Sequence, residues 1–159
     1  MNSIVLATDG SPSAEKATRL AIDLARDTGA RLCVSAVWQS PLAVYPAPPL
    51  AAVPEMEKAE KERAYDAGRK AVERAEAAGV RAESFVREGD PVDVIAQTAG
   101  DCGASLLVVG SHGWGRVRRL VFGSVSTGLL HHAPCPVLVA RSDPEAAALP
   151  TGREEKAVA

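Results

Sequence analysis

The 159-residue chain has few aromatic residues, few cysteines and little excess charge. Aromatic residues make up 4% of it, so its apolar content is almost entirely aliphatic. The three cysteines are odd in number and lack the spacing of a metal site or a disulfide framework. We therefore expect Cys33, Cys102 and Cys135 to be small buried hydrophobic side chains in a reducing compartment. A net charge of −2 argues against a general affinity for nucleic acid, so we expect no nucleic-acid partner.

Long apolar runs and targeting features are also missing. No apolar stretch approaches the roughly 20 residues that a membrane helix needs, so we expect no membrane association. The segment after Met1 has neither the basic start nor the cleavage site of a signal peptide, which makes the cytoplasm the expected location. What remains, 47% hydrophobic and 24% charged residues, is typical of one globular domain that folds without disulfides or metal.

Segments typical of strands and helices alternate along the chain. Continuous aliphatic runs at 4–7 and 106–109 have the composition of parallel strands that are buried on both faces, and the mainly apolar segment 32–37 predicts another buried strand. Residues 81–87 have the alternation of an edge strand, and a strand at 136–139 begins with a proline. Helices are predicted between these strands, at 12–28, 55–78, 91–99 and 124–132.

This alternation predicts an α/β fold, a single doubly wound five-stranded parallel sheet with helices on both faces. We expect the strand order 3-2-1-4-5. In such sheets the ligand lies beyond the carboxyl ends of the strands where the winding direction reverses, here between the first and fourth strands. The domain would span 1–141, and the composition of 142–159 predicts a disordered C-terminal tail. Five prolines within 39–54 predict an inserted loop or flap without regular structure.

The segment after the fourth strand has three features of an anion site. Gly110, Gly113 and Gly123 allow the backbone to approach a phosphate closely. A helix that begins at Ser124 would direct free N–H groups and the positive end of its dipole to the same place. Ser124 and Ser126 add hydroxyl donors. The glycines alone are also compatible with a simple turn, but the three features together favour a phosphate-like ligand.

Asp9 lies at the carboxyl end of the first strand, on the opposite wall of the expected crevice. A carboxylate repels phosphate but accepts hydrogen bonds from ribose hydroxyls, so the two walls suit a nucleotide. The alternative is that Asp9 closes the turn or caps the first helix, a role for which Ser11 competes. The loop is not a Walker A motif, because Gly123 is followed by Ser124 rather than lysine, and the first turn lacks G-x-G-x-x-G.

A G-x2-G-x9-G-S spacing runs from Gly110 to Ser124, with HHAPCP after it and TDGS at the front of the chain. This combination resembles the ATP-binding subgroup of the universal stress protein family over about residues 2–141. The resemblance implies that the protein binds ATP, ADP or AMP, with Mg²⁺ as an optional companion of the phosphates. It also implies a homodimer, and the apolar edge of the strand at 136–141 predicts that two copies pair there.

The resemblance also implies roles for individual residues. Adenine would lie near Val37 and the end of the first strand, with Asp9 on the ribose and Val109 and Gly110 beside it. Arg116 is a candidate partner of a terminal phosphate. The full set of residues implied to contact the nucleotide is Ala7, Thr8, Asp9, Val37, Val109, Gly110, His112, Gly113, Arg116, Gly123, Ser124, Val125 and Ser126.

We therefore expect a regulatory module of the stress response that binds ATP, with slow or no hydrolysis, and whose state is read by an unidentified protein partner. The alternative is an ATP-hydrolysing or nucleotidyl-transferring enzyme of the same α/β class. Such an enzyme needs a positioned base or a metal cluster facing the phosphates, and Asp9 and His112 are the available candidates. We predict neither a catalytic residue nor a metal site.

Overall fold

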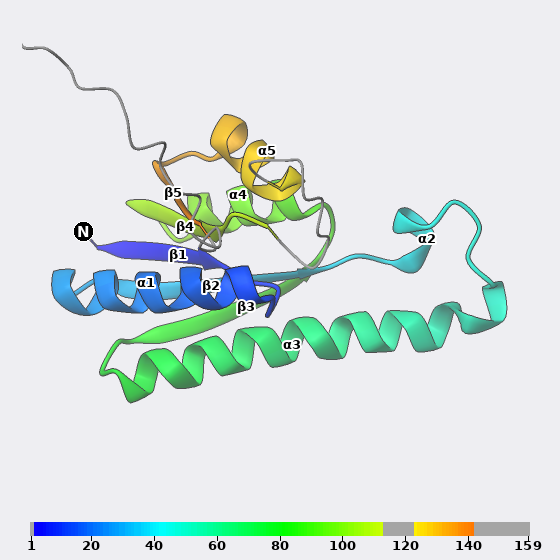
Figure 1. The fold of residues 1–159 in the computed structure, drawn as a ribbon, viewed down its shortest axis with the longest axis horizontal. Helices are drawn as coiled ribbons and strands as arrows, with labels where there is room; N and C mark the ends of the chain where they lie inside the picture. The colour runs from blue at the N-terminus through cyan, green and yellow to red at the C-terminus, as the bar shows by residue number, and fades with distance from the viewer. Residues whose placement is uncertain (1, 113–122, 142–159) are drawn as a thin grey trace, which may run out of the picture.

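The computed structural model describes residues 2–112 and 123–141 of the chain. In this part of the chain five parallel strands form one sheet in the order β3-β2-β1-β4-β5, as the sequence predicts (Figure 1). The strands are β1 (Ser3–Ala7), β2 (Arg31–Trp38), β3 (Ala82–Glu88), β4 (Leu106–Gly110) and β5 (Val137–Ala140). Ala7 at the end of β1 is in register with Ser35 of β2, and Leu6 is in register with Val108 of β4. The carboxyl ends of these three strands therefore meet at one edge of the sheet.

Helices cover both faces of the sheet. The helices α1 (Pro12–Thr28) and α3 (Val53–Ala77) lie on one face, and α4 (Pro91–Asp101) and α5 (Ser124–His132) lie on the other (Figure 1). Successive strand residues alternate between two apolar clusters, so Leu6 packs with the alanines of α1 and α3 while Val5 packs with α4 and α5. Within the described residues, no helix combines the length and the hydropathy that a bilayer crossing requires.

The helices that follow β1 and β3 begin with side-chain caps at the carboxyl edge of the sheet. Ser11 Oγ accepts a hydrogen bond from the Ala14 N–H at 3.3 Å, and Pro12 occupies the first turn of α1. Asp90 caps α4 in the same way, accepting from the Val92 N–H at 2.9 Å. These caps fix where each helix leaves the sheet and so position the loops that surround the cavity described below.

The prediction that residues 39–54 lack regular structure is wrong. A short helix, α2 (Pro41–Val44), and a 3₁₀ helix, η1 (Leu50–Ala52), lie within this segment, and α3 already begins at Val53. Proline breaks a helix only in its interior, and here Pro41 and Pro54 occupy first-turn positions, where the missing N–H has no intrahelical partner to lose.

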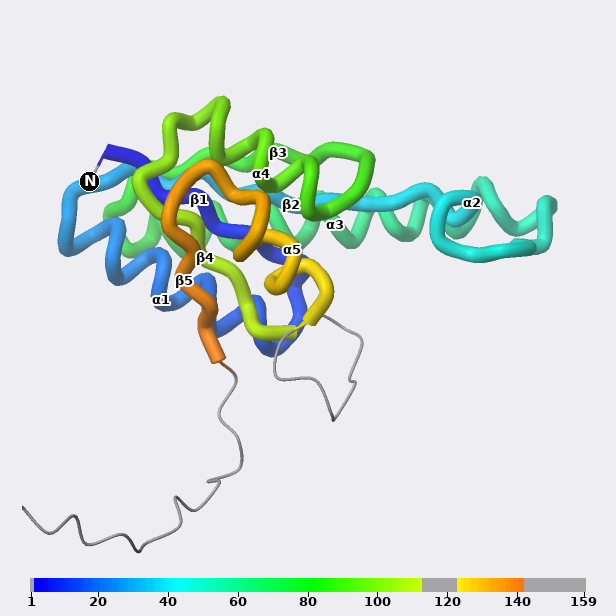
Figure 2. Tube along the Cα trace, turned by 90° about the horizontal axis from the view of Figure 1, so that it is seen from above, coloured from blue at the N-terminus to red at the C-terminus, as the bar shows by residue number. Residues whose placement is uncertain are grey.

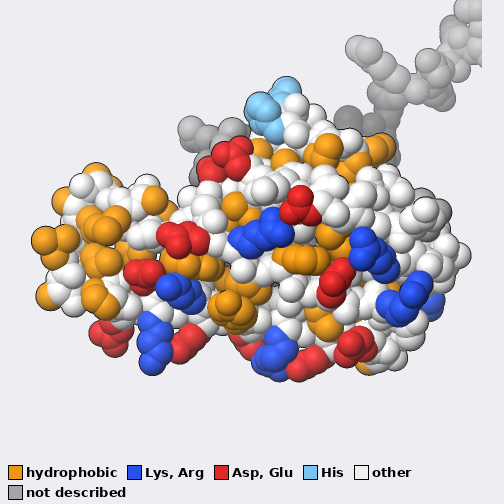
Figure 3. Space-filling model, turned by 180° about the vertical axis from the view of Figure 1, so that it is seen from behind, with side chains coloured by type: hydrophobic (Ala, Val, Ile, Leu, Met, Phe, Trp, Pro, Cys, Tyr) orange, Lys and Arg blue, Asp and Glu red, His pale blue; other side chains and the backbone are white. Residues whose placement is uncertain are grey.

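The segment with α2, η1 and the first turns of α3 projects beyond the sheet (Figures 1 and 2). Hydrophobic side chains gather on this projection (Figure 3), and the exposed ones include Leu42, Tyr45 and Leu50. Its base is anchored at Trp38, a buried residue at the end of β2, because Lys61 Nζ lies 4.4 Å from the centre of the Trp38 ring. The anchoring brings α3 against the carboxyl end of β2.

The cysteines behave as the sequence predicts in two of three cases. Cys33 and Cys102 are buried, Cys135 is half-buried, and all three are free. Burial, together with the neighbouring Cys33, raises the pKa of the Cys102 thiol to about 12. Cys102 is therefore a protonated, inert side chain at neutral pH.

Gly110 ends β4 in direct contact with the start of α1. A Cβ atom on this residue would lie 2.8 Å from Ser13 Oγ, 2.9 Å from the Ser13 carbonyl carbon and 3.0 Å from the Ala14 nitrogen. Two of these three atoms belong to the backbone of α1, which cannot swing aside as a flexible side chain can. Glycine at this position is thus required for the close approach of β4 and α1.

We expect Gly110→Ala to lower the free energy of unfolding by about 1–3 kcal/mol, because the added methyl group overpacks the contact with α1. The measurement is urea denaturation followed by circular dichroism. Gly100→Ala is the matched control: a Cβ there meets nothing within 4 Å, and alanine favours a helix, so its stability should rise or stay unchanged. Unchanged stability in Gly110→Ala would mean that α1 moves away at no cost.

Candidate functional site

A cavity of about 300 Å³ lies over the carboxyl ends of β1, β2 and β4. It opens where the winding direction of the sheet reverses, next to β1 and β4, as expected for a doubly wound fold. Every residue that the sequence nominated and that the structure describes lines this cavity: Ala7, Thr8, Asp9, Val37, Val109, Gly110, His112, Gly123, Ser124, Val125 and Ser126. Gly113 and Arg116 lie outside the described residues.

One end of the cavity is apolar and the other is polar. The apolar end lies over β2, where Val37 faces Ile95 and Pro91 of α4. The polar end lies over β4, where His112 and the first turn of α5 form the wall. Because β1 lies between β2 and β4, and neighbouring strands are about 4.8 Å apart, the two ends are separated by about 10 Å.

Asp9 lies between the two ends, at the turn from β1 to α1. Its Oδ1 accepts a hydrogen bond from the Ser11 N–H at 2.9 Å, while the Ser11 hydroxyl caps α1. Both roles that the sequence left open are thus filled by separate residues: Ser11 is the helix cap, and Asp9 closes the turn. Asp9 also lines the cavity, so closing the turn does not remove it from the site.

Hydrogen bonds join the end of β4 to the start of α5. The Gly123 N–H donates to the Ser111 carbonyl at 2.7 Å, and the Ser126 hydroxyl donates to the Gly123 carbonyl at 3.0 Å or to the Ser111 carbonyl at 3.3 Å. The main-chain N–H of His112 donates to Ser13 Oγ of α1 at 3.2 Å. These bonds hold His112 and Gly123 beside the cavity. They also engage the Ser126 hydroxyl, which would have to leave them to donate to a phosphate.

The backbone conformation of Gly123 differs from the positive φ that a glycine-rich turn suggests. Its φ is −72°, an angle that any residue adopts, so the positive φ that only glycine tolerates easily is not used here. A Cβ on Gly123 would lie 3.4 Å from the His112 Cα and 3.4 Å from the Ser111 oxygen, at the limit of ordinary van der Waals contact, so the fold itself accommodates an alanine here. Gly123 precedes the first turn of α5, whose free N–H groups begin at the wall of the cavity.

Several lining residues escaped the sequence analysis: Ala14, Ser35, Gln39, Arg63, Pro91 and Ile95. A signal existed for Ser35, which is two residues before Val37 on the same strand and therefore shares its face. No such signal existed for Arg63, because α3 follows a long irregular connection and its position over β2 is a matter of tertiary packing.

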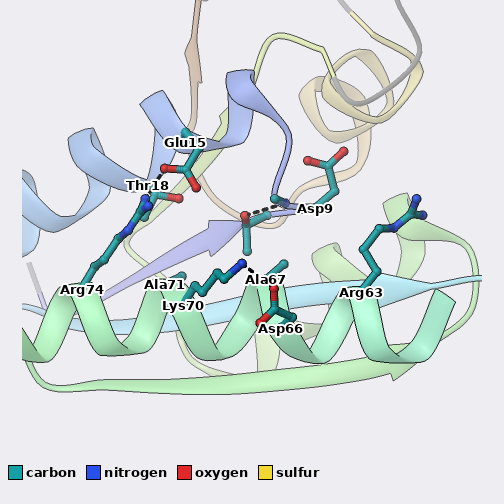
Figure 4. A pocket seen from close by; sticks show the side chains of 11 residues that line it. Asp9, Glu15, Thr18, Arg63, Asp66, Ala67, Lys70, Ala71 and Arg74 are labelled. Carbon is teal, nitrogen blue, oxygen red and sulfur yellow. Dashed lines mark hydrogen bonds and ion pairs between the residues drawn. The ribbon is translucent and has the colours of Figure 1, made fainter. Parts of the chain in front are cut away.

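A second hollow of about 210 Å³ lies between α1 and α3 (Figure 4). Four of its charged side chains form two ion pairs, Arg74 with Glu15 and Lys70 with Asp66 at 2.6 Å, and Arg63 pairs with Glu60 outside the hollow. Hydrogen bonds from Lys70 and Arg69 hold the pKa of Asp66 below its usual value. Since these charges compensate each other, we place the candidate site in the larger cavity, which shares Arg63 and the Asp9 turn with this hollow.

No group of three or more His, Cys, Asp or Glu side chains among the described residues is arranged to hold a metal ion.

Comparison of the sequence with known protein families identifies its family. The model of the universal stress protein family matches residues 1–141. The chain belongs to the universal stress protein family. It is 36% identical over 139 residues to a universal stress protein of Thermus aquaticus, an alignment that covers 87% of this chain and 97% of that one.

Solved structures of universal stress proteins share the fold. UspA from Lactobacillus plantarum matches with a TM-score of 0.77 at 26% identity, covering 88% of this chain and 97% of that one. A universal stress protein solved in complex with cAMP matches with a TM-score of 0.67 at 29% identity, covering 89% and 98%. Of the glycine and serine motif, the described residues Gly110, Gly123 and Ser124 therefore lie at the switch point of the sheet.

Proposed function

We propose that this universal stress protein binds an adenine nucleotide, with ATP as the principal ligand, in the cavity over β1, β2 and β4. The observation that carries the proposal is the order of groups along the cavity. An apolar end, a carboxylate and a helix N-terminus follow one another in the order of a base, a ribose and a phosphate chain. The related structure with cAMP supports the choice of an adenine nucleotide.

Each part of the ligand has a matching wall. Val37 and Ile95 provide apolar surface for the base, and Asp9 provides acceptors for ribose hydroxyls. The first turn of α5, with the exposed Ser124, offers N–H and O–H donors and the positive end of a helix dipole to the phosphates. Gly113 and Arg116 remain predictions from the family resemblance.

A divalent cation would be held mainly by the phosphates. Among the described lining residues Asp9 is the only carboxylate, and it already accepts the Ser11 N–H. Mg²⁺ commonly binds through substrate phosphates with one or two carboxylates and several waters, so this wall fits a cation that arrives with ATP better than a resident one.

The cavity is better suited to holding ATP than to cleaving it. Phosphoryl transfer needs an oriented nucleophile and a group that positions it. Residues 113–122 contain no Asp, Glu or Gln, and Asp9 follows β1 at the sugar end. His112 is the titratable side chain nearest to the α5 terminus among the described lining residues, and its Nδ1 lies 3.2 Å from Ser111 Oγ. The output of the module is then a bound or free state that a partner protein reads.

The binding proposal predicts that Gly123→Ala weakens ATP binding by about tenfold or more. The added Cβ would pack against Ser111 and His112 and place a methyl group beside the N–H groups of α5 that the phosphates are proposed to approach. Isothermal titration with AMP, ADP and ATP measures the effect, and circular dichroism checks that the fold is retained. Gly100→Ala, on the exposed side of α4, is the control and should bind like the wild type. Equal ATP affinity in both variants would show that the phosphates do not bind at the start of α5.

Hydrolysis should be slow compared with the roughly 1–100 s⁻¹ of protein kinases. The measurement is a single-turnover assay with radiolabelled ATP and Mg²⁺, run on the wild type and on His112→Ala at saturating protein. We expect little product in either case. Turnover of several per second that is lost in His112→Ala, with ATP affinity retained, would identify an enzyme instead.

A homodimer through the edge of β5 is the proposed assembly. The carbonyls of Pro136 and Ala140 accept hydrogen bonds from β4, so the even-numbered residues of this strand face β4 and the backbone of Val137 and Val139 faces outward. Among the described residues no strand pairs with that outer edge. Pairing with a second copy satisfies it and closes the assembly.

Val139→Pro should convert the dimer to a monomer, because it removes an outward N–H and leaves the bonds to β4 in place. Val139→Thr keeps the N–H and serves as the control. Sedimentation velocity over a range of protein concentrations reports the assembly. A wild type that stays monomeric at the highest concentration would contradict the proposal.

A further inference from the structure

Ser35 carries a buried hydroxyl for which the described part of the chain offers no hydrogen-bond partner. The residue is 1% exposed and lies in the middle of the sheet, in register with Ala7 of β1 and Phe85 of β3. Its carbonyl is satisfied, since it accepts the Thr8 N–H at 3.0 Å. Leaving a buried hydroxyl without a partner is costly, and such groups are uncommon in native proteins.

Other buried hydroxyls in the described residues do have partners. Thr18 donates to the Ala14 carbonyl at 2.8 Å, and Thr98 donates to the Val94 carbonyl at 2.8 Å. Ser3, on the neighbouring strand and equally buried, lies 3.6 Å from Cys33 Sγ. Ser35 is therefore an exception, and it is also the one of these residues that lines the cavity.

The position of Ser35 in the cavity indicates that the base is the part of the nucleotide that it would contact. It shares a face of β2 with Val37, at the apolar end of the cavity, whereas Gly110 and the start of α5 lie beyond β1, about 10 Å away. Asp9, after β1, lies between them. Ala7, Val37 and Ile95 surround this end with apolar side chains, which suit a flat aromatic ring.

We propose that the Ser35 hydroxyl forms a hydrogen bond with the base of the bound nucleotide and so contributes to its affinity. The inference rests on the proposed function. A hydroxyl both donates and accepts, so it can meet either a ring nitrogen or the exocyclic amino group of adenine. In the free protein this hydroxyl is buried without a partner among the described residues, so it meets the ligand by rotation of the serine side chain toward the cavity, and the ligand supplies the missing partner.

Ser35→Ala tests the inference through two measurements with opposite expected signs. The affinity for AMP should fall roughly three- to tenfold, the loss of one hydrogen bond. The thermal midpoint of the ligand-free protein should rise, because the variant removes a buried polar group that had no partner. Ser3→Ala is the matched control, a buried serine on β1 that does not line the cavity, and it should bind AMP like the wild type.

Comparison of ligands locates the contact on the base. Ser35→Ala should lose the same factor for AMP, ATP and dAMP, because neither the phosphate number nor the 2′-hydroxyl affects a contact with the base. A loss that disappears with dAMP would place the hydroxyl on the ribose and overturn the inference. A wild-type affinity in Ser35→Ala would also overturn the inference. So would a ligand-free thermal midpoint that falls in Ser35→Ala, because a buried water would then satisfy the hydroxyl in the free protein.

Titration of the wild type separates this inference from the proposal on which it rests. Wild-type protein that binds AMP or ATP, with unchanged affinity in Ser35→Ala, leaves the nucleotide site standing and removes Ser35 from it. Wild-type protein that binds neither nucleotide overturns both.

Discussion

The parallel pairing of β1 with β2 on one side and with β4 on the other is the constraint on which the rest of the structure depends. It brings three carboxyl ends to one edge, and the helices that follow β1 and β4 in the chain, α1 and α5, lie on opposite faces of the sheet. The divergence of α1 and α5 opens the cavity, and the missing Cβ of Gly110 allows β4 and the backbone of α1 to lie close together. The geometry of the site is thus a consequence of sheet topology and of one missing Cβ.

In the described part of the cavity, the positive groups that could face the negative charge of a phosphate come mainly from the backbone. Arg63 is the only Lys or Arg among the described lining residues, and it comes from α3, which packs on β2 and β3 rather than on the phosphate end. At the α5 end, main-chain N–H groups and the helix dipole are the available positive groups in the described part. Such groups can hold an anion, but they provide less of the charge neutralisation that a phosphoryl-transfer transition state needs. The electrostatics of the described residues are therefore consistent with the proposal that the site holds a nucleotide rather than cleaving it.

The sheet and the centre of the site were accessible from the sequence because they depend on local patterns. Aliphatic runs such as 106–109 identify buried strands, and a glycine-rich turn followed by Ser124 identifies a helix N-terminus at a strand end. The helices in 39–54 were missed because a proline has opposite meanings at the first turn and in the interior of a helix, and composition does not give the position. Arg63 was missed because its place depends on how α3 crosses the sheet.

Ser35 shows why a buried polar side chain can be invisible in a sequence and informative in a structure. In an aliphatic strand a serine is ordinarily satisfied by a neighbour, as Ser3 is by Cys33 at 3.6 Å, so its presence alone predicts nothing. The structure adds the missing partner and the adjacent cavity, and together they indicate a group that is satisfied only in the complex. A ligand that binds only the folded state stabilises it in proportion to the logarithm of its concentration over its dissociation constant. A hydroxyl that destabilises the empty protein and strengthens the complex increases that difference, which suits a module whose signal is the contrast between its bound and free states.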